Sequence, residues 1–287
     1  MSCYLGNIGL DMALGMMKKI DTGTIQLLCE VRDRVAVITL NRPEARNALS
    51  DDLTPALRRM IKERGEDPDV GALLITGAGT AFCAGGDIKG MGKSSRKTQM
   101  SDDERIADLK IRQRTLTGAL FNLRKPTIAA LPGPAAGAGL AIAMACDIRI
   151  AAESAFVSAG YARVGMSGDY GIAWLMTHLV GTARARELMY TADKVDAERC
   201  EQIGLFNRVV PDAVLRDEAF KLASSIAAGP SIALRNMKDN LNDALSNDYM
   251  TSLDGEAPRL VETSRTNDHQ EAVRAFIEKR DPVFTGT

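Results

Sequence analysis

Two short apolar segments that each run into a glycine-rich turn constrain the fold of this chain most. Residues 71–76 read GALLIT and lead toward FCAGGDIK, while residues 126–131 read PTIAAL and lead into PGPAAGAG. The second turn is followed by the almost wholly apolar stretch LAIAMACD, which predicts a buried helix. Short buried strands that alternate with helices are typical of an α/β core. We therefore predict an α/β fold.

Other local patterns fit the same class. Residues 24–31 and 34–41 are rich in β-branched residues and predict a β-hairpin. A helix is expected from about Ser50, which is a good N-cap residue, because apolar residues then recur at helical spacing. The pattern SDDE at residues 101–104 predicts a capping box at the start of a helix that runs to Leu123.

The chain divides into three parts by pattern. Residues 24–210 carry the strands and predict an α/β core, and residues 211–287 are helical in pattern throughout. Residues 1–23 are partly apolar, but they lack a basic leading region and Asp11 interrupts them. They match neither a signal peptide nor a membrane span, so we interpret them as a loosely ordered extension before the first strand.

Composition excludes several classes of function. The 287 residues carry a formal net charge of −1, so no global field favours a nucleic acid or a membrane as partner. The five cysteines include no CxxC pair, and the two histidines have no metal-ligand spacing. We expect no metal site and no disulfide framework, in keeping with a reducing, cytoplasmic location.

The two glycine-rich turns suggest a way to bind negative charge. A helix start presents unpaired backbone N–H groups, and small residues let a ligand approach them. Two such turns aimed at one point would form an oxyanion hole. Nucleotide binding is less well matched: Gly137 and Gly139 begin a G-x-G-x-x-G pattern, but Ile142 replaces its third glycine. A third possibility is that the turns are tight only for packing.

At these residues the chain resembles the crotonase family, also called the enoyl-CoA hydratase/isomerase superfamily. The similar segments are LNRPEARNAL (40–49), AFCAGGDIKGM (81–91), PTIAALPGPAAGAGLAIAMACDIRIA (126–151), LVGTARARELMYTADKVDAERCEQIGLFNRVVP (179–211) and HQEAVRAFIEKRDPVFTG (269–286). Their combination, order and spacing are specific, and the resemblance covers nearly everything from about Thr24 onward.

The resemblance implies a fold, a ligand and an assembly. The fold is a spiral of ββα units with a helical C-terminal part that makes trimers, which often pair into hexamers. The ligand is an acyl-CoA thioester, and no cofactor beyond that CoA is implied. The backbone amides of Gly86 and Ala138 match the two that hold the thioester oxygen. The resemblance also implies that the CoA moiety runs along a surface formed by Ala45, Arg46, Ala84, Asp87, Ile88, Lys89 and Gly133.

Two of these assignments have a simpler alternative. Lys89 is as readily interpreted as a solvated surface lysine, because lysine is mostly exposed. Asp87 is better interpreted as the cap of a following helix than as a catalytic group.

The chain departs from the family at the two glutamates that its hydratases use. The positions that match them hold Ala141 and Tyr161. Adding water to a double bond needs a group that activates water and a proton donor for carbon. Alanine supplies neither, and a tyrosine would need an unusually low pKa to act as a base near neutrality. Ordinary two-glutamate hydration is therefore not expected.

Asp169 is the remaining candidate acid–base group. It matches the position of the catalytic carboxylate in the isomerases of the family. Isomerisation needs only one base, and we expect Trp174, Met166 and the acyl chain to desolvate this carboxylate and raise its pKa. Tyr161 and Tyr170 are candidates for supporting hydrogen bonds. The alternative is that Asp169 only caps the helix that follows.

We expect an enzyme of acyl-CoA, and so of fatty-acid-type, metabolism that isomerises an enoyl-CoA double bond with Asp169 as acid and base. Three alternatives stay open at this point. The first is an enoyl-CoA hydratase (a lyase) that uses a non-standard acid–base group. The second is an acyl-CoA hydrolase, and the third is a non-catalytic acyl-CoA-binding subunit. The acyl chain itself is not determined by the sequence.

Overall fold

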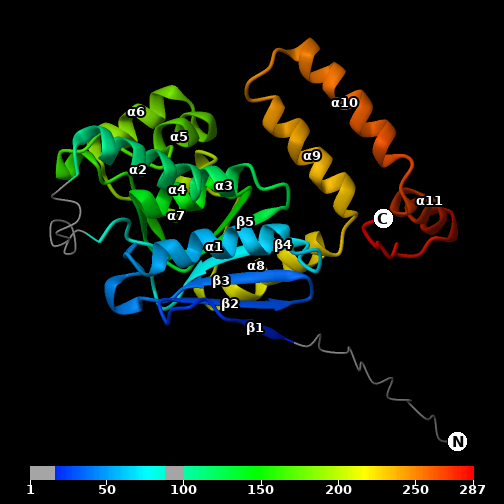
Figure 1. Ribbon diagram of the computed structural model, residues 1–287, viewed down its shortest axis with the longest axis horizontal. Helices are drawn as coiled ribbons and strands as arrows, with labels where there is room; N and C mark the ends of the chain where they lie inside the picture. Colours follow the sequence, from blue (N-terminus) through cyan, green and yellow to red (C-terminus); the bar gives the residue numbers. More distant parts are fainter. Residues whose placement is uncertain (1–16, 88–99) are drawn as a thin grey trace, which may run out of the picture.

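The computed structural model describes residues 17–87 and 100–287 (Figure 1). Ile88 and Lys89, both predicted to contact CoA, lie outside the described residues. The strands are β1 (Lys18–Ile20), β2 (Leu27–Arg32), β3 (Val35–Leu40), β4 (Ala72–Gly77), β5 (Thr127–Leu131), β6 (Ala135–Ala136), β7 (Ile148–Ala152), β8 (Phe156–Ser158), β9 (Val195–Asp196) and β10 (Arg208–Val210). The helices are α1 (Leu53–Glu66), α2 (Asp102–Arg114), α3 (Thr117–Phe121), α4 (Ala138–Ala145), α5 (Ile172–Val180), α6 (Thr182–Thr191), α7 (Ala197–Gln202), α8 (Leu215–Ala227), α9 (Ser231–Asp243), α10 (Tyr249–Thr263) and α11 (Asn267–Glu278). Short 3-10 helices are η1 (Pro43–Ala45), η3 (Ala162–Val164) and η4 (Asp212–Val214).

One large sheet organises the fold. Its described strands follow the order β1-β2-β3-β4-β5-β7-β10, and a smaller sheet has the order β6-β8-β9. The hairpin prediction is confirmed, because β2 and β3 are antiparallel and are joined by Asp33 and Arg34 with φ of 48° and 62°. Lys18–Ile20 pair with β2 as an edge strand. The interpretation of residues 1–23 as an extension before the first strand is therefore wrong for β1.

From β3 onward the neighbouring strands of the large sheet are parallel. Strands β3, β4 and β5 consequently end on the same edge, and the loops that follow them carry the candidate residues of the two turns. Open sheets of parallel strands bind ligands at this carboxyl edge. The topology therefore gathers the predicted site at one edge of the sheet.

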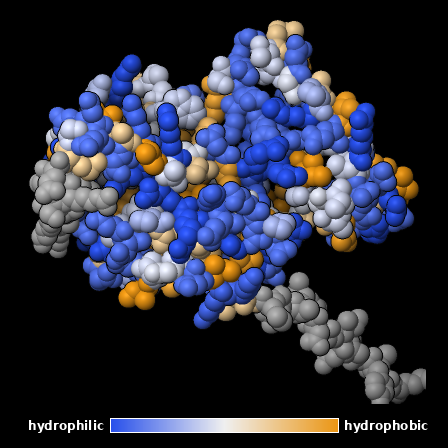
Figure 2. All heavy atoms as spheres, in the orientation of Figure 1, coloured by the Kyte–Doolittle hydropathy of each residue, from blue (hydrophilic) through white to orange (hydrophobic). Residues whose placement is uncertain are grey.

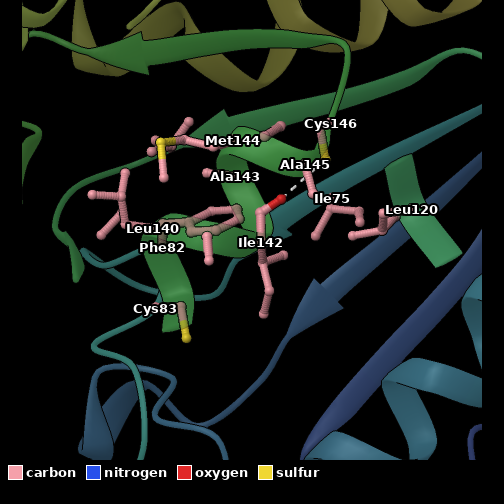
Figure 3. Packing of buried hydrophobic residues seen from close by; sticks show 14 of the residues in the cluster. Ile75, Phe82, Cys83, Leu120, Leu140, Ile142, Ala143, Met144, Ala145 and Cys146 are labelled. Carbon is pink, nitrogen blue, oxygen red and sulfur yellow. Dashed lines mark hydrogen bonds between the residues drawn. The ribbon is translucent and has the colours of Figure 1, made fainter. Parts of the chain in front are cut away.

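Helices cover both faces of the large sheet, which confirms the predicted α/β class. Helix α8 packs on one face, where Leu215 and Ala219 join a core cluster with residues of β3, β4, β5 and β7. On the other face the core includes α1, α3 and α4. Every residue of α4 is buried, as predicted from its apolar sequence, and Figure 3 shows its side chains among Ile75, Phe82 and Leu120. Helix α4 is thus held rigidly from all sides.

The helix predictions hold with two changes. Ser101 and Glu104 form the predicted capping box. The helix that should run to Leu123 is instead broken into α2 and α3 at Leu116, whose side chain is fully buried. Anchoring this leucine in the core turns the chain, which helical spacing alone does not reveal. Ser50 does accept a hydrogen bond from the Leu53 amide, although the helix begins only at Leu53.

The C-terminal helices α9, α10 and α11 extend away from the sheet (Figure 1). Helix α9 is tied to the body by Lys238, which contacts Asp147, and by Asp239, which contacts Arg124. The predicted boundary at residue 211 falls before α8, which packs on the sheet, so the part that stands apart starts at α9. No helix in residues 17–87 or 100–287 is long and apolar enough to cross a membrane.

Candidate active site

The two glycine-rich turns lie side by side. The Cys83 amide donates to the Pro134 carbonyl at 3.2 Å, and the Ala136 amide donates to the Cys83 carbonyl at 2.9 Å. Cys83 and Ala135 thereby form a parallel bridge between the loop after β4 and the loop after β5. The residues that follow each of them, including Gly86 and Ala138, leave this bridge in the same direction.

Glycine is required where the turns touch. A Cβ on Gly139 would lie 2.3 Å from the Cys83 carbonyl oxygen, and a Cβ on Gly85 would lie 2.8 Å from the Ala136 oxygen. The Ala138 nitrogen is 3.5 Å from that same Cβ position on Gly85, so it lies next to the segment that bears Gly86. Packing alone therefore explains Gly85 and Gly139, as one of the sequence alternatives expected.

Two amides in these turns are available for a ligand. Helix α4 begins at Ala138, so the Ala138 N–H is one of the unpaired groups of a helix start. Gly86 forms a bridge to Leu49, but its neighbours Gly85 and Asp87 make the hydrogen bonds. Within the described residues neither the Gly86 amide nor the Ala138 amide donates a hydrogen bond. Either one can bind an oxygen atom of a ligand.

The loops predicted to carry CoA also adjoin each other. The Ala84 amide donates to the Arg46 carbonyl at 2.9 Å, and the Asp87 amide donates to Leu49 at 3.2 Å. Asp87 accepts a hydrogen bond from the Arg42 guanidinium at 3.2 Å. Ala45 ends η1, directly before the exposed Arg46. The structure thus brings Ala45, Arg46, Ala84 and Asp87 into one surface region.

Close packing explains why residue 133 is a glycine. It is buried, and a Cβ there would lie 2.0 Å from the Thr80 carbonyl oxygen. A contact of Gly133 with CoA stays a prediction.

Asn47 was not among the site residues predicted from the sequence. Its buried side chain accepts a hydrogen bond from the Arg42 amide and donates two to the carbonyls of Ala78 and Ala81. It therefore joins the loop after β3 to the loop after β4. Its φ of 56° is one that asparagine tolerates better than most residues, so an Asn in the middle of NRPEARNAL was the available signal.

Asp169 does not cap a helix. The N-cap of α5 is Gly171, and no side chain caps it. The Asp169 carboxylate instead accepts a hydrogen bond from the Tyr161 hydroxyl. The alternative that Asp169 is only a helix cap is therefore wrong, and another reason is needed for a half-buried carboxylate at this position.

The loop that carries Asp169 has an unusual backbone. Gly168 and Gly171 have φ of 113° and 75°, which suits glycine, but Tyr170 between them has φ of 52°. A bulky residue in the left-handed region is uncommon and costs of order 1–3 kcal/mol. Such strain is typical of residues that are held for function.

Tyr161 places this carboxylate beside the second turn. The Gly137 amide donates to the carbonyl of Ser158, the last residue of β8, at 3.1 Å, so the end of β8 lies beside the turn. The Tyr161 ring carbon that bears the hydroxyl lies 3.8 Å from where a Cβ on Gly137 would be. Asp169 is therefore linked through Tyr161 to the residue that precedes Ala138.

Burial sets the protonation behaviour of this pair. Burial raises the pKa of Asp169 above its usual value, and the hydrogen bond from Tyr161 partly opposes that rise. Burial, followed by the neighbouring Asp169 carboxylate, raises the pKa of Tyr161 far above its usual value. Tyr161 is therefore a proton donor in hydrogen bonds and not a base near neutrality. Asp169 is a carboxylate whose basicity exceeds that of an exposed aspartate.

The surroundings of Asp169 differ from those expected. Trp174 is 43% exposed. Its ring packs edge-on against Phe121 and stacks on the His178 ring, with 3.9 Å between the centroids of the two stacked rings. Met166 is also half exposed. Ala141 is fully buried in α4 and brings no polar group to the site. The contacts of Trp174 thus give no support to the idea that it desolvates the carboxylate.

A family model described as Enoyl-CoA hydratase/isomerase matches residues 30–287. The chain belongs to this family. It is 35% identical to the 1,2-epoxyphenylacetyl-CoA isomerase of Escherichia coli over 262 residues, which cover 91% of this chain and 98% of the relative. It is also 35% identical to the short-chain-enoyl-CoA hydratase of Clostridium acetobutylicum over 255 residues, with 88% and 95% covered.

Solved structures agree with this membership. The structure of an enoyl-CoA hydratase from Bacillus anthracis superposes with a TM-score of 0.84 at 31% identity, covering 91% of this chain and all of that one. The crotonase-like fold with a helical C-terminal part, which the sequence predicts, is confirmed. The chain is thus a member of an acyl-CoA enzyme family in which both hydratases and isomerases are named.

Proposed function

We propose that the protein is an enoyl-CoA isomerase in which Asp169 is the single acid–base group. The observation that carries this proposal is the position of Asp169: half-buried, free of any capping role, and hydrogen-bonded to Tyr161 beside the turn that bears Ala138. Equal identity to a named hydratase and a named isomerase does not separate the two reactions. The side chains of the site must therefore distinguish hydration from isomerisation.

The proposed reaction moves one proton. The Asp169 carboxylate takes a proton from the carbon next to the thioester of a 3-enoyl-CoA, and the electron pair delocalises onto the thioester oxygen. The amides of Gly86 and Ala138 stabilise this enolate oxygen, which carries more negative charge than the starting carbonyl. The protonated Asp169, which exchanges its proton with water, then protonates the far carbon of the allylic system, and the double bond moves into conjugation with the thioester.

The residues at the hydratase positions favour this reaction over hydration. Ala141 is apolar, and the pKa of Tyr161 is raised, so neither activates water near neutrality. A proton shuttle by one carboxylate needs no water and no cofactor beyond the CoA of the substrate. A carboxylate with a raised pKa is also suited to accept a proton and release it again at neutral pH.

The loops around Arg46 and Asp87 are the proposed CoA surface. The exposed Arg46 side chain is suited to a phosphate group of CoA, since arginine binds phosphate through paired N–H donors. Ala45 and Ala84 are small and let the ligand approach the backbone.

Product analysis tests the proposal. Purified protein is incubated in D2O with a panel of 2-enoyl-CoA, 3-enoyl-CoA and saturated acyl-CoA thioesters, and products are read by mass. We expect a shifted double bond and deuterium at the carbon next to the thioester. A hydroxyacyl-CoA would favour the hydratase, free CoA would favour the hydrolase, and binding without any turnover would favour a binding subunit.

Asp169→Asn identifies the base. We expect proton exchange to fall by about two to four powers of ten while CoA binding persists, because a general base contributes about that much. The matched control is Asp193→Asn, which removes an exposed carboxylate paired with Arg163 and should leave exchange unchanged. Undiminished exchange in Asp169→Asn would refute the assignment.

We also infer that copies of the chain assemble as a trimer, or as a pair of trimers, through α9–α11. Within this single chain α10 has no buried residue, and Phe276, Ile277 and Leu260 are 87%, 74% and 71% exposed. Apolar side chains are visible on this part of the surface in Figure 2. A groove of about 380 Å³ between α9 and α10, lined partly by Met237 and Leu260, offers further apolar surface. Exposed apolar side chains gathered on one part of a surface are typical of a protein interface.

Light scattering tests the assembly. We expect a mass of three or six chains at micromolar concentration, and Phe276→Asp should reduce it. A stable monomer of the unmodified chain would contradict the inference.

A further inference from the structure

We propose that Tyr161 is a positioning residue that holds the Asp169 carboxylate by one oxygen and leaves the other oxygen to take the proton. The inference rests on the proposed function of Asp169 as the base. The Tyr161 hydroxyl donates to Oδ1 of Asp169. The other oxygen, Oδ2, has no hydrogen-bond partner in the part of the chain that the structure describes. The two carboxylate oxygens are therefore not equivalent.

The segment around Tyr161 is firmly anchored. The Tyr161 carbonyl accepts hydrogen bonds from the amides of Val164 and Met166, both at 3.0 Å. On either side of it, the Ser158 hydroxyl and the Arg163 guanidinium both donate to the carbonyl of Ala192, at 2.8 and 2.9 Å. The tyrosine side chain itself is only 7% exposed. Its hydroxyl consequently has a fixed position.

The Asp169 side chain has fewer anchors than Tyr161. The buried Tyr170 next to it fixes the loop backbone, but this does not by itself orient the carboxylate. Among the described residues Asp169 itself accepts two hydrogen bonds, one from the Tyr161 hydroxyl to the carboxylate and one from the Ile172 amide to the backbone carbonyl. The fixed phenol is therefore the group that selects one orientation of the carboxylate side chain.

Tyr161 also adjusts the basicity of Asp169. A hydrogen bond to the charged form favours that form, so the phenol lowers the pKa that burial raises. The phenol keeps its own proton throughout, because its pKa lies far above the usual value. Tyr161 thus acts through Asp169 and exchanges no proton with the substrate.

Tyr161→Phe tests this role, because it removes the hydroxyl and keeps the ring. We expect kcat for proton exchange to fall about ten- to hundredfold, as for the loss of one hydrogen bond to a charged group, with little change in KM. The acidic limb of the pH–rate profile should move to higher pH. The matched control is Tyr170→Phe, since Tyr170 is an equally buried tyrosine next to Asp169 with no hydrogen bond to it in the described residues.

A second measurement does not depend on turnover. Infrared difference titration follows the carboxyl stretch of Asp169, with Asp169→Asn as the blank. We expect the Asp169 signal to titrate at higher pH in Tyr161→Phe than in the unmodified protein, and at the same pH in Tyr170→Phe. A titration that does not move in Tyr161→Phe, or moves equally in Tyr170→Phe, overturns the role of Tyr161.

The two proposals fail in different ways. In one outcome, Asp169→Asn abolishes exchange, while Tyr161→Phe exchanges at the full rate with the same pH profile as the unmodified protein. This outcome overturns the role of Tyr161 alone. Exchange that survives in Asp169→Asn overturns the base and, with it, this inference.

Discussion

Replacing Gly139 by alanine should separate the two turns of the candidate site. The added Cβ would lie 2.3 Å from the Cys83 carbonyl oxygen and 2.7 Å from the Cys83 Cβ. Ordinary van der Waals contact begins at 3.4 Å. One turn must therefore move by about 1 Å relative to the other, and close-packed interiors resist such shifts. The movement also stretches the 2.9 Å hydrogen bond from the Ala136 amide to the Cys83 carbonyl.

The magnitude follows from these contacts. Overpacking of one methyl group costs about 1–3 kcal/mol, and a lost hydrogen bond adds about 1 kcal/mol. We expect Gly139→Ala to lower the free energy of unfolding by about 3 kcal/mol, which for a chain of this size lowers Tm by about 6–12 °C. Proton exchange on an acyl-CoA should fall as well, because the amides of Gly86 and Ala138 no longer meet at one oxygen.

The control is the same substitution at Gly255 in α10. A Cβ there would meet nothing closer than an Arg259 side-chain nitrogen at 3.8 Å. Alanine favours a helix over glycine by about 0.8–1.0 kcal/mol, so Gly255→Ala should raise Tm slightly. Thermal melts and exchange assays on both variants decide the matter. A Gly139→Ala protein with the Tm and the exchange rate of the unmodified protein would refute the reasoning.

Two further predictions concern charged groups. Because burial raises the pKa of Asp169, the stability it contributes is complete below its unfolded pKa and is lost as pH rises through the folded value. Asp169→Asn should therefore melt above the unmodified protein at pH 8, and the difference should vanish toward pH 4; a difference that grows toward low pH would contradict the raised pKa. The Lys238 side chain is 7% exposed and its ammonium lies 2.8 Å from the Asp147 carboxylate, whose side chain is 34% exposed, so Lys238→Met should lower the free energy of unfolding by about 2 kcal/mol in urea titration, because it removes a hydrogen bond between charged groups. A loss under about 1 kcal/mol, typical of an exposed ion pair, would show that the pair does not anchor α9.

The sequence by itself determined the features that close within a few residues. The capping box of Ser101 and Glu104 and the hairpin between β2 and β3 depend on neighbouring side chains and on turn geometry, so both were predictable. The apolar run of α4 predicted its burial for the same reason. Motif order and spacing also indicated the family, which the comparisons confirm.

The tertiary structure alone decided the features that join distant segments. The break at Leu116 follows from burial of that side chain in the core, which no local pattern encodes. A helix cap was the alternative prediction for Asp169. Only the N-cap of α5 at Gly171 and the position of Tyr161 show that its carboxylate faces another partner.

The tertiary structure also decided how the residues of the candidate site are arranged. The bridge between Cys83 and Ala135 brings the two turns together across more than fifty residues of chain, and the pair of Asp147 and Lys238 fixes α9 across ninety-one. Spacing in the sequence does not specify such pairs, because their geometry depends on which strands become neighbours and how the chain packs between them. The residue types of the site were therefore readable from the sequence, whereas their arrangement was set by the fold.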